Sequence, residues 1–245
     1  MSFDFSLSTN RPVLYQVSTS TALVEGVTQG AIRVGALREH GDLGLGTFEK
    51  LDGEMVAIDG GIFQMRGDGS VNQPGDDVLS AFAQIIRFMP DGETNLSHAS
   101  DLGTLLSRFD QLRSSENLFY ALRVEGDFDY MHVRAVYSST PGTTLLNAAS
   151  SQQEFTFHNV SGSLAGFWTP EYARTVSIPG YHLHFLSSDR AHGGHLLECG
   201  GSNLRLRAQR INDYHIALPT TQDFLKADLR RDPSADLAKA EGVQK

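Results

Sequence analysis

Three of the nine histidines lie close together in the sequence, at positions 182, 184 and 195. His182 and His184 belong to a run of alternating residue types that is typical of a β-strand. Residues two apart point to the same face of a strand, so these two imidazoles are expected on one side. If the chain reverses at Asp189–Arg190, the returning strand places His195 directly opposite His184. A turn at Gly193–Gly194 is the alternative, and it would give another register.

Imidazoles that converge in this way can bind one metal ion. Three protein ligands with an open fourth position are typical of catalytic zinc rather than structural zinc. The single cysteine, Cys199, excludes an internal disulfide and a Cys-rich structural site. In the register that pairs His195 with His184, His192 and Glu198 fall on the other face and are not expected to be ligands. The simpler alternative is an ordinary polar strand with surface histidines.

Two separated segments resemble a known enzyme family. The histidine segment, Gly180–His195, reads GYHLHFLSSDRAHGGH, and an upstream segment, Leu45–Met55, reads LGTFEKLDGEM. Together they resemble α-acetolactate decarboxylase, and the resemblance extends from about Leu14 to the C-terminal tail. It implies two β-rich domains with a metal site in the cleft between them, assembly as a homodimer, and decarboxylation of 2-acetolactate to acetoin and CO2.

The resemblance also assigns residues outside the histidine segment. Arg134 matches the arginine expected in the family's active site, and Glu54 matches a glutamate at the metal site. Thr47 matches a polar residue that lines the same pocket. In the tail, Glu241 best matches a glutamate that folds back to the metal, although Asp236 is close enough to compete.

These residues imply a mechanism that needs no organic cofactor. A zinc ion on the three histidines would polarise the ketone and hydroxyl of the substrate and stabilise the enediolate left by CO2 loss. Arg134 would hold the departing carboxylate with paired hydrogen bonds and help direct a proton to one face. Glu54 would ligate weakly, hold a water or handle a proton. His132 shares a strand face with Arg134 and is expected to be structural. It is the reserve metal ligand if one of the three proposed histidines does not bind the metal.

Many short strands with few helices favour an α+β, β-rich fold with mixed sheets. Two of the expected strands are predicted to form a hairpin around Gly126–Asp127. The strands are expected at Val13–Val17, Gly46–Leu51, Met55–Ile58, Ile62–Met65, Ala81–Met89, Leu118–Val124, Tyr130–Tyr137, Phe155–Trp168, the histidine hairpin, Asn203–Gln209 and Tyr214–Ala217.

Leucine and phenylalanine recur at helical spacing between Ser100 and Ser115, which predicts the clearest helix of the chain. Shorter helices are expected at Thr21–Gly26, Val34–His40, Pro141–Gln153 and Thr221–Leu229. A division after this clear helix gives an N-terminal mixed-sheet domain, residues 1–115, and a C-terminal β domain, residues 116–245, with the histidine hairpin and the tail. The polar composition of Asp232–Lys245 predicts a solvated tail. The resemblance instead requires Glu241 to reach the metal, and both can hold if the tail is anchored to the protein through Leu237.

Composition restricts the partners. A net charge of −9 and the absence of any basic run argue against a nucleic-acid surface. No stretch approaches the ~20 apolar residues of a membrane span. The N-terminus lacks the basic and apolar regions of a signal peptide, so we expect a soluble cytoplasmic protein that acts on a small anionic substrate.

Two other functions compete with the decarboxylase interpretation. A cupin-like metal-dependent oxygenase also uses His-x-His, but it needs a glutamate a few residues later, and here the nearest carboxylate is Asp189. Two histidines and one carboxylate would favour iron. A non-enzymatic β-rich binding module would bind no metal and would tolerate replacement of His184.

Overall fold

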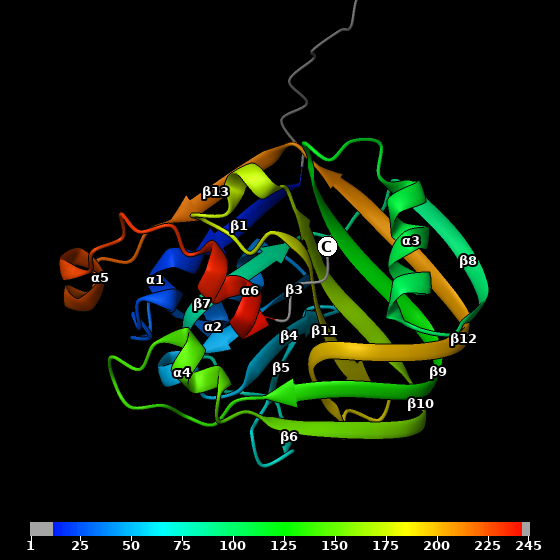
Figure 1. The fold of residues 1–245 in the computed structure, drawn as a ribbon, viewed down its shortest axis with the longest axis horizontal. Coiled ribbons are helices and arrows are strands. Elements are labelled where there is room, and N and C mark those ends of the chain that lie inside the picture. The colour runs from blue at the N-terminus through cyan, green and yellow to red at the C-terminus, as the bar shows by residue number, and fades with distance from the viewer. Residues whose placement is uncertain (1–11, 242–245) are drawn as a thin grey trace, which may run out of the picture.

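The computed structural model describes residues 12–241, which form two β-sheets and six α-helices (Figure 1). The first sheet contains eight strands and the second contains five. The sheets pack against each other through a shared apolar core, to which Leu45 and Val56 contribute from the first sheet and Ala165 and Phe167 from the second. The α+β, β-rich fold predicted from the sequence is confirmed.

The first sheet is mixed and consists of short strands. They are β1 (Val13–Val17), β2 (Ile32–Arg33), β3 (Leu43–Phe48), β4 (Glu54–Ile58), β5 (Gly61–Met65), β6 (Val71–Asn72), β7 (Leu79–Ile86) and β13 (Asp213–Ala217). The strand order is β13-β1-β7-β3-β4-β5-β6, with β2 paired to β7. Only the β1–β13 pair of this sheet is parallel.

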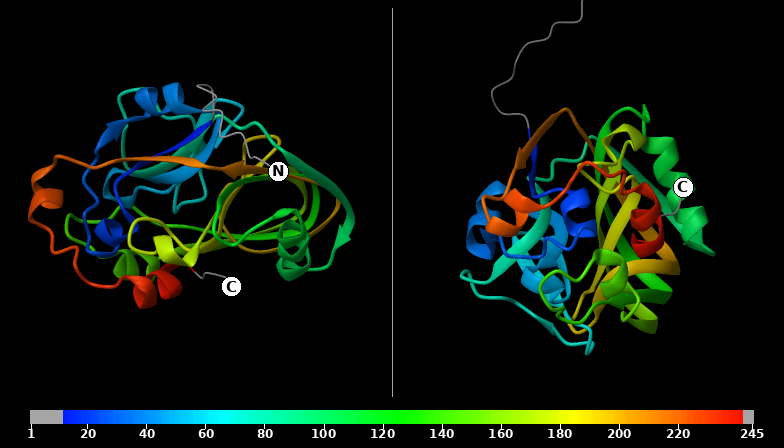
Figure 2. Two further views of the ribbon diagram at one scale, coloured as in Figure 1. Left: turned by 90° about the horizontal axis from the view of Figure 1, so that it is seen from above. Right: turned by 60° about the vertical axis from the view of Figure 1, so that its left-hand side comes forward.

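The second sheet is antiparallel and has three long strands. Its members are β8 (Gly92–Ala99), β9 (Phe119–Ala135), β10 (Gln153–Thr169), β11 (Gly180–Ser187) and β12 (Gly193–Ile211), in the order β11-β10-β9-β12-β8. β11 also pairs with the start of β12. Register shifts interrupt the β12–β9 ladder at three places, and such bulges bend strands. The long strands accordingly curl, as Figure 2 shows.

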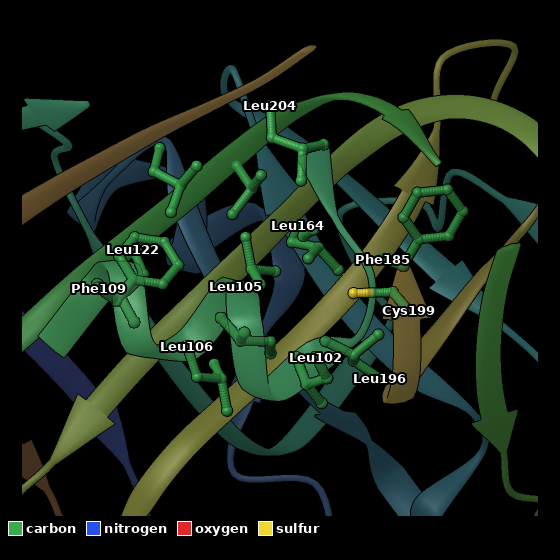
Figure 3. Packing of buried hydrophobic residues seen from close by; sticks show 14 of the residues in the cluster. Leu102, Leu105, Leu106, Phe109, Leu122, Leu164, Phe185, Leu196, Cys199 and Leu204 are labelled. Atoms are coloured by element: carbon green, nitrogen blue, oxygen red, sulfur yellow. The ribbon is translucent and has the colours of Figure 1, made fainter. Parts of the chain in front are cut away.

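The predicted amphipathic helix is α3 (Leu102–Leu112), and its apolar stripe packs on the second sheet. The Asp101 side chain caps its N-terminus by accepting a hydrogen bond from the Thr104 amide. Leu102, Leu105, Leu106 and Phe109 are buried against strand residues such as Leu122, Leu164 and Leu204 (Figure 3). The clearest helix of the sequence analysis is thus confirmed, together with its buried face.

The remaining helices are short. They are α1 (Ser20–Val24), α2 (Val34–His40), α4 (Leu145–Ala149), α5 (Gln222–Lys226) and α6 (Ser234–Glu241), with 3₁₀ turns at Glu49–Leu51 and Glu171–Ala173. Leu23 of α1, Ala148 of α4 and Leu237 of α6 belong to one buried apolar cluster. Three helices that are distant in sequence therefore meet beside the sheets, in the left half of Figure 1.

The hairpin expected around Gly126–Asp127 is wrong. β9 runs through these residues without a turn, because β10 pairs with both of its halves and Gly126 lies opposite Gly162. β8 was not predicted at all, since its sequence, GETNLSHA, is polar and lacks a continuous apolar alternation. It is an edge strand, where polar residues are common.

The two sheets exchange segments across the expected domain division. β8 and α3 precede residue 116 but pair with, or pack on, the second sheet. β13 follows residue 116 but pairs with β1 in the first sheet. Segments on both sides of residue 116 therefore contribute to each sheet, and the division into two domains at this residue stays a prediction.

Candidate metal and active site

The β11–β12 hairpin brings the three histidines together in the predicted register. His182 and His184 lie on β11, and His195 of β12 is the direct partner of His184. The reversal lies in the loop between the strands, where Arg190 adopts a positive φ and Asp189 accepts hydrogen bonds within the turn. The alternative turn at the double glycine is wrong. One nitrogen of each histidine lies within 4.8 Å of the others, and all three side chains are buried.

Hydrogen bonds to backbone carbonyls fix the orientation of two imidazoles. His184 Nδ1 lies 2.7 Å from the carbonyl oxygen of Met55, and His195 Nε2 lies 3.0 Å from that of Glu241. A carbonyl only accepts, so these nitrogens carry the protons and the opposite ring nitrogens keep their lone pairs. His184 Nε2 faces His182 Nε2 at 3.2 Å. The unprotonated nitrogens of His184 and His195, Nε2 and Nδ1, thus face the cluster.

Burial keeps the three histidines neutral. Removal from water lowers the pKa of His182 to about 3, with the nearby Arg134 charge acting in the same direction. Burial first, and then the neighbouring histidines and the Arg134 charge, hold the pKa values of His184 and His195 well below the usual range. Neutral imidazole is the form that binds metal ions.

The carboxylate of Glu241 lies beside the histidine nitrogens. Its Oε2 atom is 3.7 Å from His182 Nε2, 3.6 Å from His195 Nδ1 and 3.2 Å from Arg134 Nη2. Both members of the Arg134–Glu241 pair are buried, with 7% and 8% of their side chains exposed. A tail residue therefore reaches the centre of the protein, 107 residues away in sequence from its arginine partner.

Glu54, at the start of β4, approaches the histidines from the first sheet. Its Oε2 atom lies 3.6 Å from His184 Nε2. Burial raises the pKa of Glu54 to about 8, although the Arg134 charge opposes this shift. Burial also raises the pKa of Glu241. A cation among these groups would favour the ionised form of both carboxyls.

Arg134 lies on β9, the strand between β10 and β12. On β9 it lies between His195 of β12 and Glu154 of β10. Its two terminal nitrogens donate hydrogen bonds, Nη1 to Gln152 at 2.7 Å and Nη2 to Glu241. Within residues 12–241, Nε is buried and has no hydrogen-bond partner. Such an unpaired donor is available to a bound anion.

A cavity opens beside these groups. Five polar residues line it: Thr47, Glu54, Arg134, His182 and Glu241. The hydroxyl of Thr47 donates to the Gly53 carbonyl at 2.8 Å. The apolar residues that line it were missed by sequence reasoning; among them are Leu23, Leu51, Phe82, Val136, Leu145 and Ile178. These residues come from separate elements, so no spacing in the sequence connects them.

The two other histidines that sequence reasoning considered lie outside the cluster. His132 Nε2 pairs with Glu154 at 3.1 Å, and a third of its side chain is exposed. His192 stacks on Phe157, with ring centroids 4.3 Å apart. The histidine cluster of the described residues therefore contains neither His132 nor His192.

Three further residues of the sequence analysis also lie away from the cluster. Glu198 accepts a hydrogen bond from the Leu102 amide at the start of α3. Asp236 pairs with Arg231 at 2.8 Å, so Glu241 is the tail acid that reaches the site. Cys199 is buried in the apolar core, which raises the pKa of its thiol to about 12.

The tail is ordered through α6. Leu237 is 1% exposed within the apolar cluster that includes α1 and α4, and Ala240 is equally buried. The solvated tail expected from composition is therefore wrong for residues 234–241, whereas anchorage through Leu237 is confirmed. Residues 242–245 lie outside the described part of the chain.

Comparison with known proteins gives a consistent result. The family model for alpha-acetolactate decarboxylase matches residues 14–231. The alpha-acetolactate decarboxylase of Methanosarcina mazei is 41% identical over 230 residues, covering 94% of this chain and 80% of the relative. That of Bacillus licheniformis is 34% identical over 235 residues, covering 95% and 93%. The crystal structure of alpha-acetolactate decarboxylase from Bacillus subtilis strain 168 superposes with a TM-score of 0.89 at 32% identity, covering 93% of this chain and 98% of that one.

Proposed function

Because the chain belongs to the α-acetolactate decarboxylase family, we propose that it converts 2-acetolactate to acetoin and CO2 with a zinc ion on His182, His184 and His195. The observation that carries the metal proposal is the convergence of three buried, neutral imidazoles. His182 borders a cavity that the buried Arg134 also lines.

The donor set fits zinc. Two ligands at 2.0–2.1 Å from a tetrahedral zinc ion are about 3.3–3.4 Å apart, and the His182 and His184 Nε2 atoms are separated by 3.2 Å. The backbone carbonyls of Met55 and Glu241 accept hydrogen bonds from the ring nitrogens of His184 and His195 that would not bind the metal. Such hydrogen bonds commonly orient histidine ligands of zinc. When bound, zinc supplies Lewis-acid chemistry at the ketone and hydroxyl oxygens of the substrate.

Arg134 supplies the positive charge that an anionic substrate needs. Its free Nε donor and planar guanidinium suit the carboxylate that leaves as CO2. Glu54 borders the same cavity and its Oε2 atom lies 3.6 Å from His184 Nε2, so it is placed to hold a water or to handle a proton near the reacting carbon. Thr47 is a further polar residue in the lining of this cavity.

The apolar residues of the lining complement the remaining part of the substrate. 2-Acetolactate carries two methyl groups, and aliphatic residues such as Leu145 and Ile178 offer them an apolar surface. These apolar residues would also exclude water from the substrate. Electrostatic interactions are stronger in a dry site, so the negative charge that develops on decarboxylation would be stabilised more strongly.

Assembly and location stay predictions of the sequence. Within residues 12–241 no helix has the length and apolar character required to cross a membrane. We propose a cytoplasmic homodimer, with a small anionic substrate and without a nucleic-acid partner. Light scattering coupled to size-exclusion chromatography tests the dimer, and a mass of one chain would contradict it.

A direct assay tests the proposed function against its two rivals. Purified protein with 2-acetolactate is expected to release equal amounts of acetoin and CO2 without oxygen uptake, and to contain zinc. Iron together with oxygen uptake would favour a cupin-like oxygenase. The nearest carboxylate for that rival, Asp189, is occupied within the turn by Ser187 and Ala191. No metal and no turnover would favour a binding module.

The tail acid is expected to be required for turnover. Glu241→Gln removes the charge that faces Arg134, His182 and His195. We expect acetoin formation to fall well beyond tenfold, which is about 1.4 kcal/mol of barrier, without unfolding of the protein.

Two truncations make a matched pair for this prediction. Deletion of Gly242–Lys245 leaves Glu241 in place and is expected to be nearly harmless. Deletion of Ala240–Lys245 removes the acid and should reproduce the Glu241→Gln loss. Equal acetoin production by the two truncated proteins would show that Glu241 has no role.

A further inference from the structure

Arg134 has a second anchor besides Glu241, and it is a neutral one. Gln152 precedes β10, and its Oε1 atom accepts a hydrogen bond of 2.7 Å from Arg134 Nη1. The backbone N–H of Gln152 donates a hydrogen bond to the backbone carbonyl of Ala149. Ala149 lies at the end of α4 and lines the cavity. Gln152 thus connects the guanidinium to the helix that borders the cavity.

The orientation of the Gln152 amide is determined by charge on both sides. Its Nε2 atom donates to Glu154 Oε1 at 3.0 Å, while its oxygen faces the guanidinium. A guanidinium only donates and a carboxylate only accepts, so the reverse orientation would satisfy neither neighbour. The amide is therefore held in one direction.

This arrangement keeps a nearby carboxylate away from Arg134. Glu154 lies directly opposite Arg134 in the β9–β10 register. Its two oxygens are bonded instead to Gln152 Nε2 and to His132 Nε2, at 3.0 and 3.1 Å. Arg134 consequently contacts a neutral amide oxygen at Nη1, so its positive charge is not neutralised from that side.

We propose that Gln152 is a positioning residue for Arg134 in the decarboxylation reaction, an inference that rests on the proposed function. One hydrogen bond, from Nη2 to Glu241, leaves the guanidinium free to rotate about it. A second bond, from Nη1 to Gln152, fixes the plane and leaves the unpartnered Nε donor for the substrate carboxylate. Fixed donors favour the transition state because they need no reorganisation during the reaction.

Gln152→Met tests the inference, because methionine has a similar length and no strong acceptor. We expect kcat to fall roughly tenfold, the usual consequence of losing one hydrogen bond to a charged group. KM, zinc content and Tm should stay near wild-type values, since Arg134 keeps its charge. Ser150→Ala is the matched control: it removes a local hydrogen bond to Asn147 at the end of α4 and should leave kcat unchanged.

A double-mutant cycle separates positioning from a general structural role. Lysine has no planar fork, so Gln152→Met should cost nothing further in an Arg134→Lys background. A full additional tenfold loss in that background would overturn the inference. So would a Gln152→Met protein with lowered zinc content or Tm, because the defect would then be structural.

A charged variant gives an independent readout. Gln152→Glu keeps an acceptor oxygen for Arg134 but adds a negative charge, so KM for 2-acetolactate should rise more than kcat falls. An unchanged KM would contradict the inference. An inactive wild-type protein refutes the proposed function itself, whereas an active wild type with an equally active Gln152→Met variant refutes only the role of Gln152.

Discussion

His184→Ala is expected to remove bound zinc and acetoin formation together. His184 is the central member of the cluster, because its Nε2 atom faces both His182 and Glu54 while its Nδ1 atom is held by the Met55 carbonyl. Loss of the metal removes Lewis-acid stabilisation worth several kcal/mol. We expect the turnover rate to fall at least about a thousandfold, which is about 4 kcal/mol of barrier.

The control for this variant is His132→Ala. His132 lies on β9 outside the cluster and pairs with Glu154 near the surface, so its replacement should keep zinc and most of the activity. Metal content is measured by elemental analysis of protein whose circular dichroism is unchanged. Full zinc retention in the alanine variants of all three histidines would contradict the assigned ligands. Retention in His195→Ala alone would make His132 or His192 the third ligand.

Arg134→Lys is expected to lower kcat by about a hundredfold, since removal of one preorganised donor at a developing charge costs that much in other enzymes. Lysine keeps the positive charge beside Glu241, so the carboxylate is not left buried without a partner. The lost feature is the fork that bonds Gln152 and Glu241 simultaneously.

The readout for Arg134→Lys combines steady-state kinetics with zinc content and Tm. A large fall in kcat at normal zinc content and near-normal Tm assigns the residue to the substrate. Unfolding of the variant, or wild-type turnover, would show that Arg134 is merely structural. Arg108→Lys is a suitable control, because Arg108 bonds only the exposed Gln111 on α3 among the described contacts.

The histidine cluster was predictable because its geometry is local. Strand alternation places His182 and His184 on one face, and a turn directly after β11 leaves one register for His195. Glu54, Arg134 and Glu241 come from three other elements, and no sequence spacing joins them to the hairpin. Only the family resemblance indicated these residues before the structure placed them beside the histidines.

The errors have a common origin in long-range pairing. Gly126 looked like a turn, but strands on both sides hold β9 straight through it. The polar segment of β8 becomes a strand only because β12 pairs with it. The charged tail folds as α6 because Leu237 packs into an apolar cluster to which the distant helices α1 and α4 contribute. In each case tertiary contacts override a local signal.

Zinc titration of metal-free wild-type protein tests the central claim most directly. Acetoin release from 2-acetolactate is measured as zinc is added to protein stripped with a chelator. The three-histidine site predicts that activity rises from near zero in proportion to added zinc and reaches a plateau at one ion per chain. Full activity of the stripped protein, or no recovery after zinc is restored, would contradict a zinc-dependent decarboxylase at His182, His184 and His195.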